Sequence, residues 1–146
     1  MSHLDAVVAR YAKLFDGSVP RETTARLDNV EKELSVILPV DLKDLLLRYG
    51  YGSTAVPNIS TAVKDTRRFR SAVDLPDRYV VLDDMNDGGV VLLDTQSADG
   101  PVLWVDSHAV GKLRSNNLSQ SEHDLFPSFV SWLERCLDND EQFRAT

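Results

Sequence analysis

Apolar residues recur at helical spacing through the first fifty positions of the chain. Successive segments place leucine, valine and aromatic residues at i, i+3, i+4 and i+7, which is the pattern of a helix with one buried face. Thr23 or Thr24 suits the N-cap of the second segment, and Pro39 suits the first turn of the third. The predicted helices cover residues 4–15, 24–35 and 39–50, within a helical region of about residues 3–50.

Three valine-rich runs in the second half of the chain have the length and composition of β-strands, and each ends in aspartate. The residues between the runs are rich in turn-forming Asn, Asp, Gly and Pro, so the simplest arrangement is an antiparallel meander. Because antiparallel order reverses alternate strands, we expect Asp94 at the opposite end of the sheet from Asp83 and Asp106. The predicted strands cover residues 79–83, 90–94 and 102–106.

The segments on either side of these runs are less regular. Residues 55–59 have the composition of a short edge strand, so the sheet would span about residues 55–106. Residues 60–70 fit either a helix or a loop. A closing helix is predicted at about residues 125–137, with Asp124 as its N-cap and apolar residues at helical spacing behind it.

The overall composition is that of an ordinary globular domain: of 146 residues, 42% are hydrophobic and 27% are charged. The apolar runs are far shorter than the roughly 20 residues that a membrane-spanning helix needs, and the first residues lack a signal-peptide pattern. We therefore expect a cytoplasmic protein with no membrane partner. Cys136 is the single cysteine, which excludes an internal disulfide. We predict one α+β domain over residues 1–146, an antiparallel meander flanked by N-terminal helices and a C-terminal helix.

Negative charge is concentrated in the predicted sheet. The formal net charge is −7, and residues 72–108 alone reach that value with eight aspartates against the single Arg78. Residues 64–70, by contrast, carry four basic side chains and one acid. We expect a positively charged partner for the acidic segment and no nucleic acid, because phosphates would be repelled. The eight aspartates are Asp74, Asp77, Asp83, Asp84, Asp87, Asp94, Asp99 and Asp106.

The polar residues do not form a recognisable catalytic or metal-binding motif. Asp83 and Asp106 would share one end of the sheet roughly 10 Å apart, which is too far to share a proton. The three histidines lack the spacing of a zinc or di-iron site, and the turn after Asp83 departs from a calcium loop at two ligand positions. We therefore predict no catalytic residue, metal or cofactor. An enzyme that uses acids near Trp104 is a remaining alternative.

Residues 30–50 carry a specific pattern: Glu and Leu, then Leu-Pro, an acidic residue and a leucine-rich helix ending in glycine. This pattern resembles the signature of the SUKH superfamily, and the Gly-Gly pair before the second valine-rich run resembles the strand region of the same proteins. Ser35 stands where the family usually has glycine, and Tyr-Gly-Tyr-Gly at 49–52 replaces its Asn-Gly-Gly turn. The matching positions are Glu31, Leu34, Leu38, Pro39, Asp41, Leu45, Leu46, Gly50, Gly88, Gly89, Asp94 and Trp104, followed by residues 126–133.

The resemblance implies a small α+β domain that binds other proteins without being an enzyme. Bacterial members of the superfamily act mainly as immunity proteins that neutralise toxins, often basic nucleases, and fungal relatives regulate cell-wall assembly. The expected partner is a basic cognate protein toxin, whose active site would be occluded by an acidic edge of Asp83, Asp84, Asp87 and Asp106. The same aspartates are also typical of turns and strand ends that keep a sheet soluble. The alternative is a regulatory or scaffolding module that binds a cellular enzyme.

Overall fold

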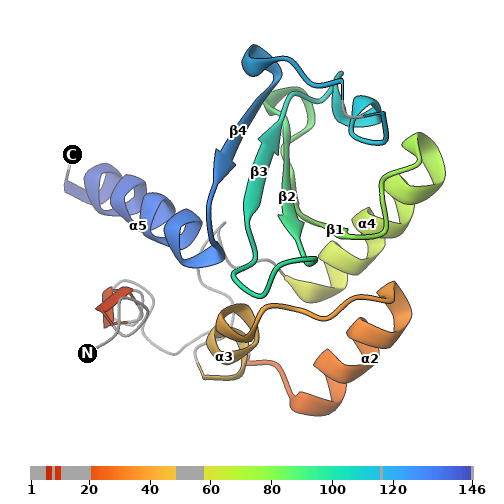
Figure 1. Cartoon of the computed structure of the whole chain (residues 1–146). Helices are drawn as coiled ribbons and strands as arrows, with labels where there is room; N and C mark the ends of the chain where they lie inside the picture. The colour runs from red at the N-terminus through yellow and green to blue at the C-terminus, as the bar shows by residue number, and fades with distance from the viewer. Residues whose placement is uncertain (1–5, 8, 11–20, 49–57, 116, 146) are drawn as a thin grey trace.

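The chain folds into helices and a four-stranded antiparallel sheet with the strand order β1-β2-β3-β4 (Figure 1). This architecture confirms the predicted α+β class. The structure is a computed structural model, and it describes residues 6–7, 9–10, 21–48, 58–115 and 117–145, with side chains as far as residue 139. The strands are β1 (Tyr79–Asp84), β2 (Val90–Asp94), β3 (Val102–Val105) and β4 (His123–Phe126). The helices are α2 (Thr24–Leu34), α3 (Val40–Arg48), α4 (Ile59–Val73) and α5 (Phe129–Ala145), with short 3-10 helices η1 (Asn86–Gly88), η2 (Val110–Lys112) and η3 (Gln120–Glu122).

The helices α2 and α3 form where the sequence predicts them. Thr23 is the N-cap of α2, and its hydroxyl accepts the N–H of Arg26 at 3.2 Å. Ser35 ends the helix in the left-handed conformation, with φ 56°. The described residues of the predicted helix at 4–15 are helical, while the rest of that helix and the predicted stop at Gly50 lie outside the described residues. The leucine stripes of α2 and α3 are buried, as their spacing indicates.

The helix α4 occupies the segment that the sequence left undecided. Asn58 is its N-cap, and the side-chain oxygen accepts two backbone N–H groups of the first turn. Ile59 is the first residue of the helix, so the predicted edge strand at 55–59 is wrong at its last two residues. Residues 55–57 lie outside the described part of the chain. The capping asparagine explains the difference, because it satisfies helical N–H groups that a strand would pair elsewhere.

The helix α4 packs along the outer edge of β1. The hydroxyl of the fully buried Thr66 donates to the carbonyl oxygen of Ala62 at 2.7 Å and accepts the N–H of Val81 at 2.9 Å. This N–H belongs to an edge strand and has no strand partner on that side. The contact with Thr66 therefore closes part of an edge that could otherwise pair with another chain.

The C-terminal segment differs from the prediction. Asp124 and Leu125 belong to β4, which pairs with β3, and α5 begins only at Phe129. The predicted closing helix at 125–137, with Asp124 as its cap, is therefore wrong at its start. Pro127 follows the strand, and the hydroxyl of Ser128 accepts the N–H of Ser131 in the first turn of α5. The sheet thus covers residues 79–126 in four strands, in place of the predicted 55–106.

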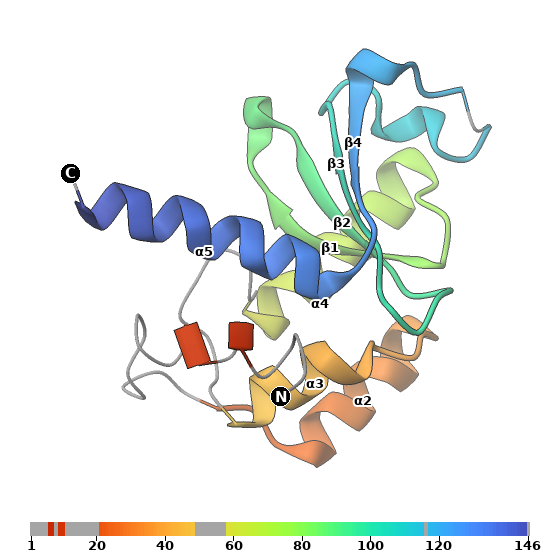
Figure 2. The ribbon, with the colours of Figure 1, turned by 60° about the vertical axis from the view of Figure 1, so that its left-hand side comes forward.

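Both faces of the sheet are covered over β1, β2 and β3, which explains why β3 and most of β1 and β2 are apolar. The first core cluster joins one face to α2, α3, α4 and α5, and the second joins the other face to the segment around η2 (Figure 2). Strand β2 is buried at all five residues. From the sheet, Val80, Leu82, Val91, Leu93 and Val102 belong to the first cluster, and Tyr79, Val81, Val90, Leu92, Leu103 and Val105 belong to the second.

The register confirms that Asp94 lies at the other end of the sheet from Asp83 and Asp106. Asp94 is paired with Tyr79 at the start of β1, whereas Asp83 is paired with Val91 near the start of β2. We call the end that carries Asp83, Asp84, Asp87 and Asp106 the acidic end of the sheet. It lies at the top of Figure 1, away from α2 and α3.

Candidate protein-binding surface at the acidic end

The strand register places a row of four side chains across one face of the acidic end. Beyond an irregularity in the register of β1 between Val81 and Asp83, Asp83 is opposite Val91 of β2, and Val91 is opposite Trp104 of β3. Trp104 in turn is opposite Asp124 of β4. Directly opposite residues of an antiparallel pair point to the same face, so two carboxylates end a row that contains tryptophan. The strands of the two carboxylates are three spacings of about 4.8 Å apart.

The indole of Trp104 lies against the turn between β1 and β2. Its Nε1 donates a hydrogen bond to the carbonyl oxygen of Gly88 at 2.8 Å. A Cβ atom on Gly89 would lie 2.2 Å from the same Nε1, and Gly89 has φ +101°. Only glycine therefore leaves room for the ring there. This contact gives a physical reason for the Gly89 and Trp104 positions of the family pattern.

A cavity of about 270 Å³ opens beside Trp104, between β3, β4 and α5. Phe126 and Trp132 meet edge to face in its wall, with ring centroids 4.9 Å apart. The Nε1 atom of Trp132 is buried and has no hydrogen-bond partner within the described part of the chain. We call this the aromatic cavity, and it is lined by Trp104, Asp124, Phe126, Trp132, Arg135 and Asn139.

The four aspartates proposed from the sequence differ in their surroundings. Asp84 forms an ion pair with Arg68 at 2.5 Å, and Arg68 also approaches Asp65 at 3.4 Å. Asp83 is partly buried, and burial followed by the negative charges of Asp84 and Asp65 raises its pKa above the ordinary value. Asp87 is exposed in η1. The carboxylate of Asp84 is therefore the least available of the four for a partner.

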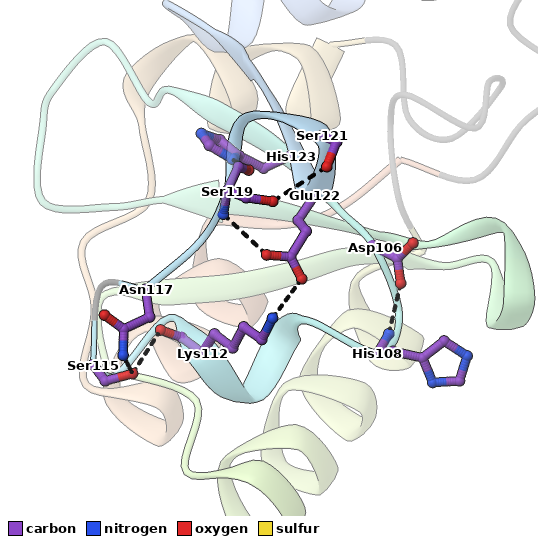
Figure 3. A network of polar contacts seen from close by, with 9 residues as sticks. All are labelled: Asp106, His108, Lys112, Ser115, Asn117, Ser119, Ser121, Glu122 and His123. Atoms are coloured by element: carbon purple, nitrogen blue, oxygen red, sulfur yellow. Dashed lines mark hydrogen bonds and ion pairs between the residues drawn. The ribbon is translucent and has the colours of Figure 1, made fainter.

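The fourth of these residues, Asp106, belongs to the turn that follows β3. Its Oδ1 accepts the N–H of His108 at 2.9 Å (Figure 3). That donor is a backbone N–H group, so the bond brings no cation to the carboxylate. Within the described residues, no ion pair reaches Asp83, Asp87, Asp106 or Asp124. The acidic end therefore carries four carboxylates without a cation of their own.

A polar network fixes the connection between β3 and β4 (Figure 3). Glu122 accepts the backbone N–H of Ser119 at 3.0 Å and forms an ion pair with Lys112 at 2.7 Å. The hydrogen bond from Lys112, followed by those from Ser119, lowers the pKa of Glu122 to about 2. His123 adds a contact of 2.8 Å between its Nδ1 and the carbonyl oxygen of Ser119. These contacts hold the start of β4 and so fix the position of Asp124.

The sequence did not indicate the aromatic cavity. The sequence pattern predicts Asp124 as a helix cap and gives no role to Arg135 or Asn139. The signal that could have revealed the cavity is the residue order of His123–Phe126, in which Asp124 and Phe126 share one face of a strand. The position of α5 against β4 is a tertiary feature, and the sequence pattern of the helix alone does not contain it.

The described residues hold neither a metal-binding cluster nor a membrane-spanning helix. Among these residues there is no group of three His, Cys, Asp or Glu side chains placed to hold a metal ion. None of the described helices has the length and apolar character needed to cross a membrane. The features described are thus exposed charge at the acidic end and an aromatic cavity that runs from Trp104 along β4 and α5.

Comparison with known protein families agrees with the fold and with the motif residues. A comparison with curated proteins gave no significant match. The family model SUKH_5, described as SMI1-KNR4 cell-wall, matches residues 7–138. The match includes all four strands and the helices α2, α3 and α4, together with the first part of α5. The chain therefore belongs to the SUKH family.

Proposed function

We propose that this protein is an immunity protein that binds a basic cognate toxin and neutralises it by covering the active site of the toxin. Membership of the SUKH family supports a role in binding proteins. The observation that carries the proposal is the aromatic cavity, which lies beside carboxylates that have no cation within the described part of the chain. Aromatic and arginine side chains are the residues that dominate protein interfaces.

The two parts of this surface have different roles in the proposed complex. The carboxylates of Asp83, Asp87, Asp106 and Asp124 attract a basic cleft at long range and raise the association rate. The aromatic cavity receives a side chain of the toxin and slows dissociation, because buried aromatic contacts remain once water is excluded. A nuclease whose basic cleft is covered in this way cannot admit its phosphate substrate.

The first test is capture of the partner and measurement of the activity of that partner. The tagged protein is co-purified from lysate of the cells that make it, and the captured protein is assayed alone and in the complex. The proposal expects a basic protein whose toxic activity is lost on binding. A partner that keeps full activity in the complex would contradict neutralisation and favour the regulatory or scaffolding role.

The second test uses two charge-matched double variants with the captured partner. Asp87→Asn with Asp124→Asn removes two unpaired acids from the candidate surface, and we expect an association rate about 10-fold lower at low salt. Glu22→Gln with Asp28→Asn removes the same charge from the region of α2, where neither acid has an ion pair within the described residues. The control should change the rate by less than about 2-fold. Equal losses in both double variants would show a general charge effect and contradict this surface.

Trp132→Ala probes the aromatic cavity separately from charge. Truncation of a buried interface tryptophan typically costs about 2 kcal/mol or more, so we expect a dissociation constant at least about 30-fold higher, mainly through faster dissociation. Leu125→Ala is the matched control, because this exposed residue of β4 does not line the cavity. An unchanged affinity in the folded Trp132 variant would remove the cavity from the proposal.

A further inference from the structure

The loop between α2 and α3 exposes apolar side chains at the other end of the sheet. The side chains of Ile37 and Val40 are 77% and 71% exposed, which makes them the most exposed large hydrophobic residues of the described chain. Between them, the side chain of Leu38 is only 1% exposed, and Pro39 is also buried. The loop therefore shows two aliphatic side chains to solvent while its middle is anchored in the core. Adjacent exposed apolar residues of this kind often mark interaction sites.

A cavity of about 240 Å³ adjoins these side chains. One wall is the loop itself, residues 37–40, and the other is the turn after β2, residues 95–98. The cavity lies next to the exposed face of the loop, so a side chain that packs on Ile37 and Val40 can enter it. Its size suits a single aliphatic side chain rather than a whole ligand, because ligand sites are usually about 300 Å³ or larger.

The loop is held by contacts on two sides. The carboxylate of Glu31 accepts the N–H of Leu38 at 2.7 Å and also pairs with Lys43 at 3.3 Å. On the other side, a Cβ atom on Gly100 would lie 2.5 Å from Cγ of Pro39, so the turn after β2 packs directly on the proline. A surface that is already ordered loses little conformational entropy when a partner binds.

Unneutralised negative charge borders the two exposed side chains. Asp41 lies in the first turn of α3, and burial followed by the charges of Asp44 and Asp99 raises its pKa. Asp44 has its own cation, because Arg48 contacts it at 3.0 Å. Within the described residues, Asp41 and Asp99 have no ion pair. A cation brought by a partner would relieve the repulsion between these carboxylates.

We propose that Ile37, Val40 and the adjoining cavity form a second docking surface, for a protein segment that presents an aliphatic side chain flanked by lysine or arginine. The aliphatic side chain enters the cavity, and the flanking cations approach Asp41 and Asp99. This surface shares no lining residue with the aromatic cavity. The inference therefore does not depend on whether the acidic end neutralises a toxin.

The test titrates the ¹⁵N-labelled protein with the probe peptide acetyl-Arg-Leu-Lys-Leu-Leu-Arg-amide and follows backbone amide shifts by NMR. We expect shifts to concentrate on residues 37–41 and 95–99, with a dissociation constant on the order of 1 mM, as befits a short flexible peptide. Two control peptides replace the leucines by serine or the basic residues by glutamate. Neither should produce these shifts at the same concentration. Shifts confined to the acidic end, or equal shifts with the serine peptide, would overturn the proposal.

A pair of matched protein variants completes the test. Val40→Asp places a charge on the proposed surface, and we expect the affinity for the probe peptide to fall at least about 10-fold. Leu125→Asp makes the same kind of change at a 63% exposed residue of β4 and should leave the affinity unchanged. Both residues are exposed, so both variants should fold, which their amide spectra show directly. Equal loss of affinity in both variants, or no loss in the Val40 variant, would contradict the surface.

Discussion

The two ends of the sheet both carry aspartates at strand ends, but these aspartates have different environments. Asp94 is 6% exposed, and its two oxygens accept hydrogen bonds from Nε and Nη2 of Arg78. At the acidic end, burial and then the charges of Asp84 and Asp65 raise the pKa of Asp83. A carboxylate with its cation inside the fold serves stability, whereas one without a cation remains available to a partner.

The contact of the Trp104 indole with the turn between β1 and β2 helps to hold the acidic end, and Gly89→Ala should show this most strongly. The new Cβ atom would meet the Trp104 ring, and the backbone conformation of Gly89 is one that other residues rarely adopt. We expect a loss of about 3 kcal/mol in the free energy of unfolding, measured by urea denaturation. Gly111→Ala is the control, because its Cβ would find its nearest neighbour at 4.0 Å. It should change stability by less than about 0.5 kcal/mol.

At the opposite end, Asp94→Ala tests whether a paired aspartate supports the fold. The substitution removes both acceptors of Arg78 and also the acceptor of the Gln96 N–H. Because Arg78 is partly exposed, we expect about 2 kcal/mol of destabilisation, below the value for a fully buried pair. Asp87→Ala, at the acidic end, should change the free energy of unfolding by less than about 0.5 kcal/mol. Similar losses at the two positions would remove the contrast between the ends.

The smallest expected effect is a gain in stability from Asp83→Asn. A carboxyl group whose pKa is raised in the folded protein binds its proton more tightly there, so it destabilises the fold as pH rises above its ordinary pKa of about 3.9. We expect the variant to melt about 2 °C higher at pH 7 and to lose this advantage near pH 3, as measured by calorimetry. A lower melting temperature of the variant at pH 7 would mean that the ionised carboxylate of Asp83 stabilises the fold.

The parts of the fold that depend on local pattern were predictable from the sequence. The leucine stripes of α2 and α3 and the three valine-rich strands give clear periodicities, and the turns between the strands contain the expected residues. The boundary between β4 and α5 was not predictable in this way. The four residues of β4 are too few to show a clear alternation of apolar and polar side chains. Asp124 resembles a helix cap as long as its pairing with Trp104 is unknown.

The candidate surface was predictable only in part. The sequence shows that the aspartates gather at strand ends, and the register confirms that Asp83 and Asp106 share one end. The sequence could not show that Arg68 neutralises Asp84, because this contact depends on how α4 packs along β1. The aromatic cavity likewise requires α5 to lie beside β4, and Trp132 and Arg135 have no recognisable partner before that geometry is known.

The positions of Trp104 and Trp132 have a practical consequence. The chain contains two tryptophans, and both line the aromatic cavity. All of the intrinsic tryptophan fluorescence of the protein therefore comes from residues that line the aromatic cavity. A molecule that enters the cavity contacts both indoles, so its binding should change the emission spectrum of the unlabelled protein.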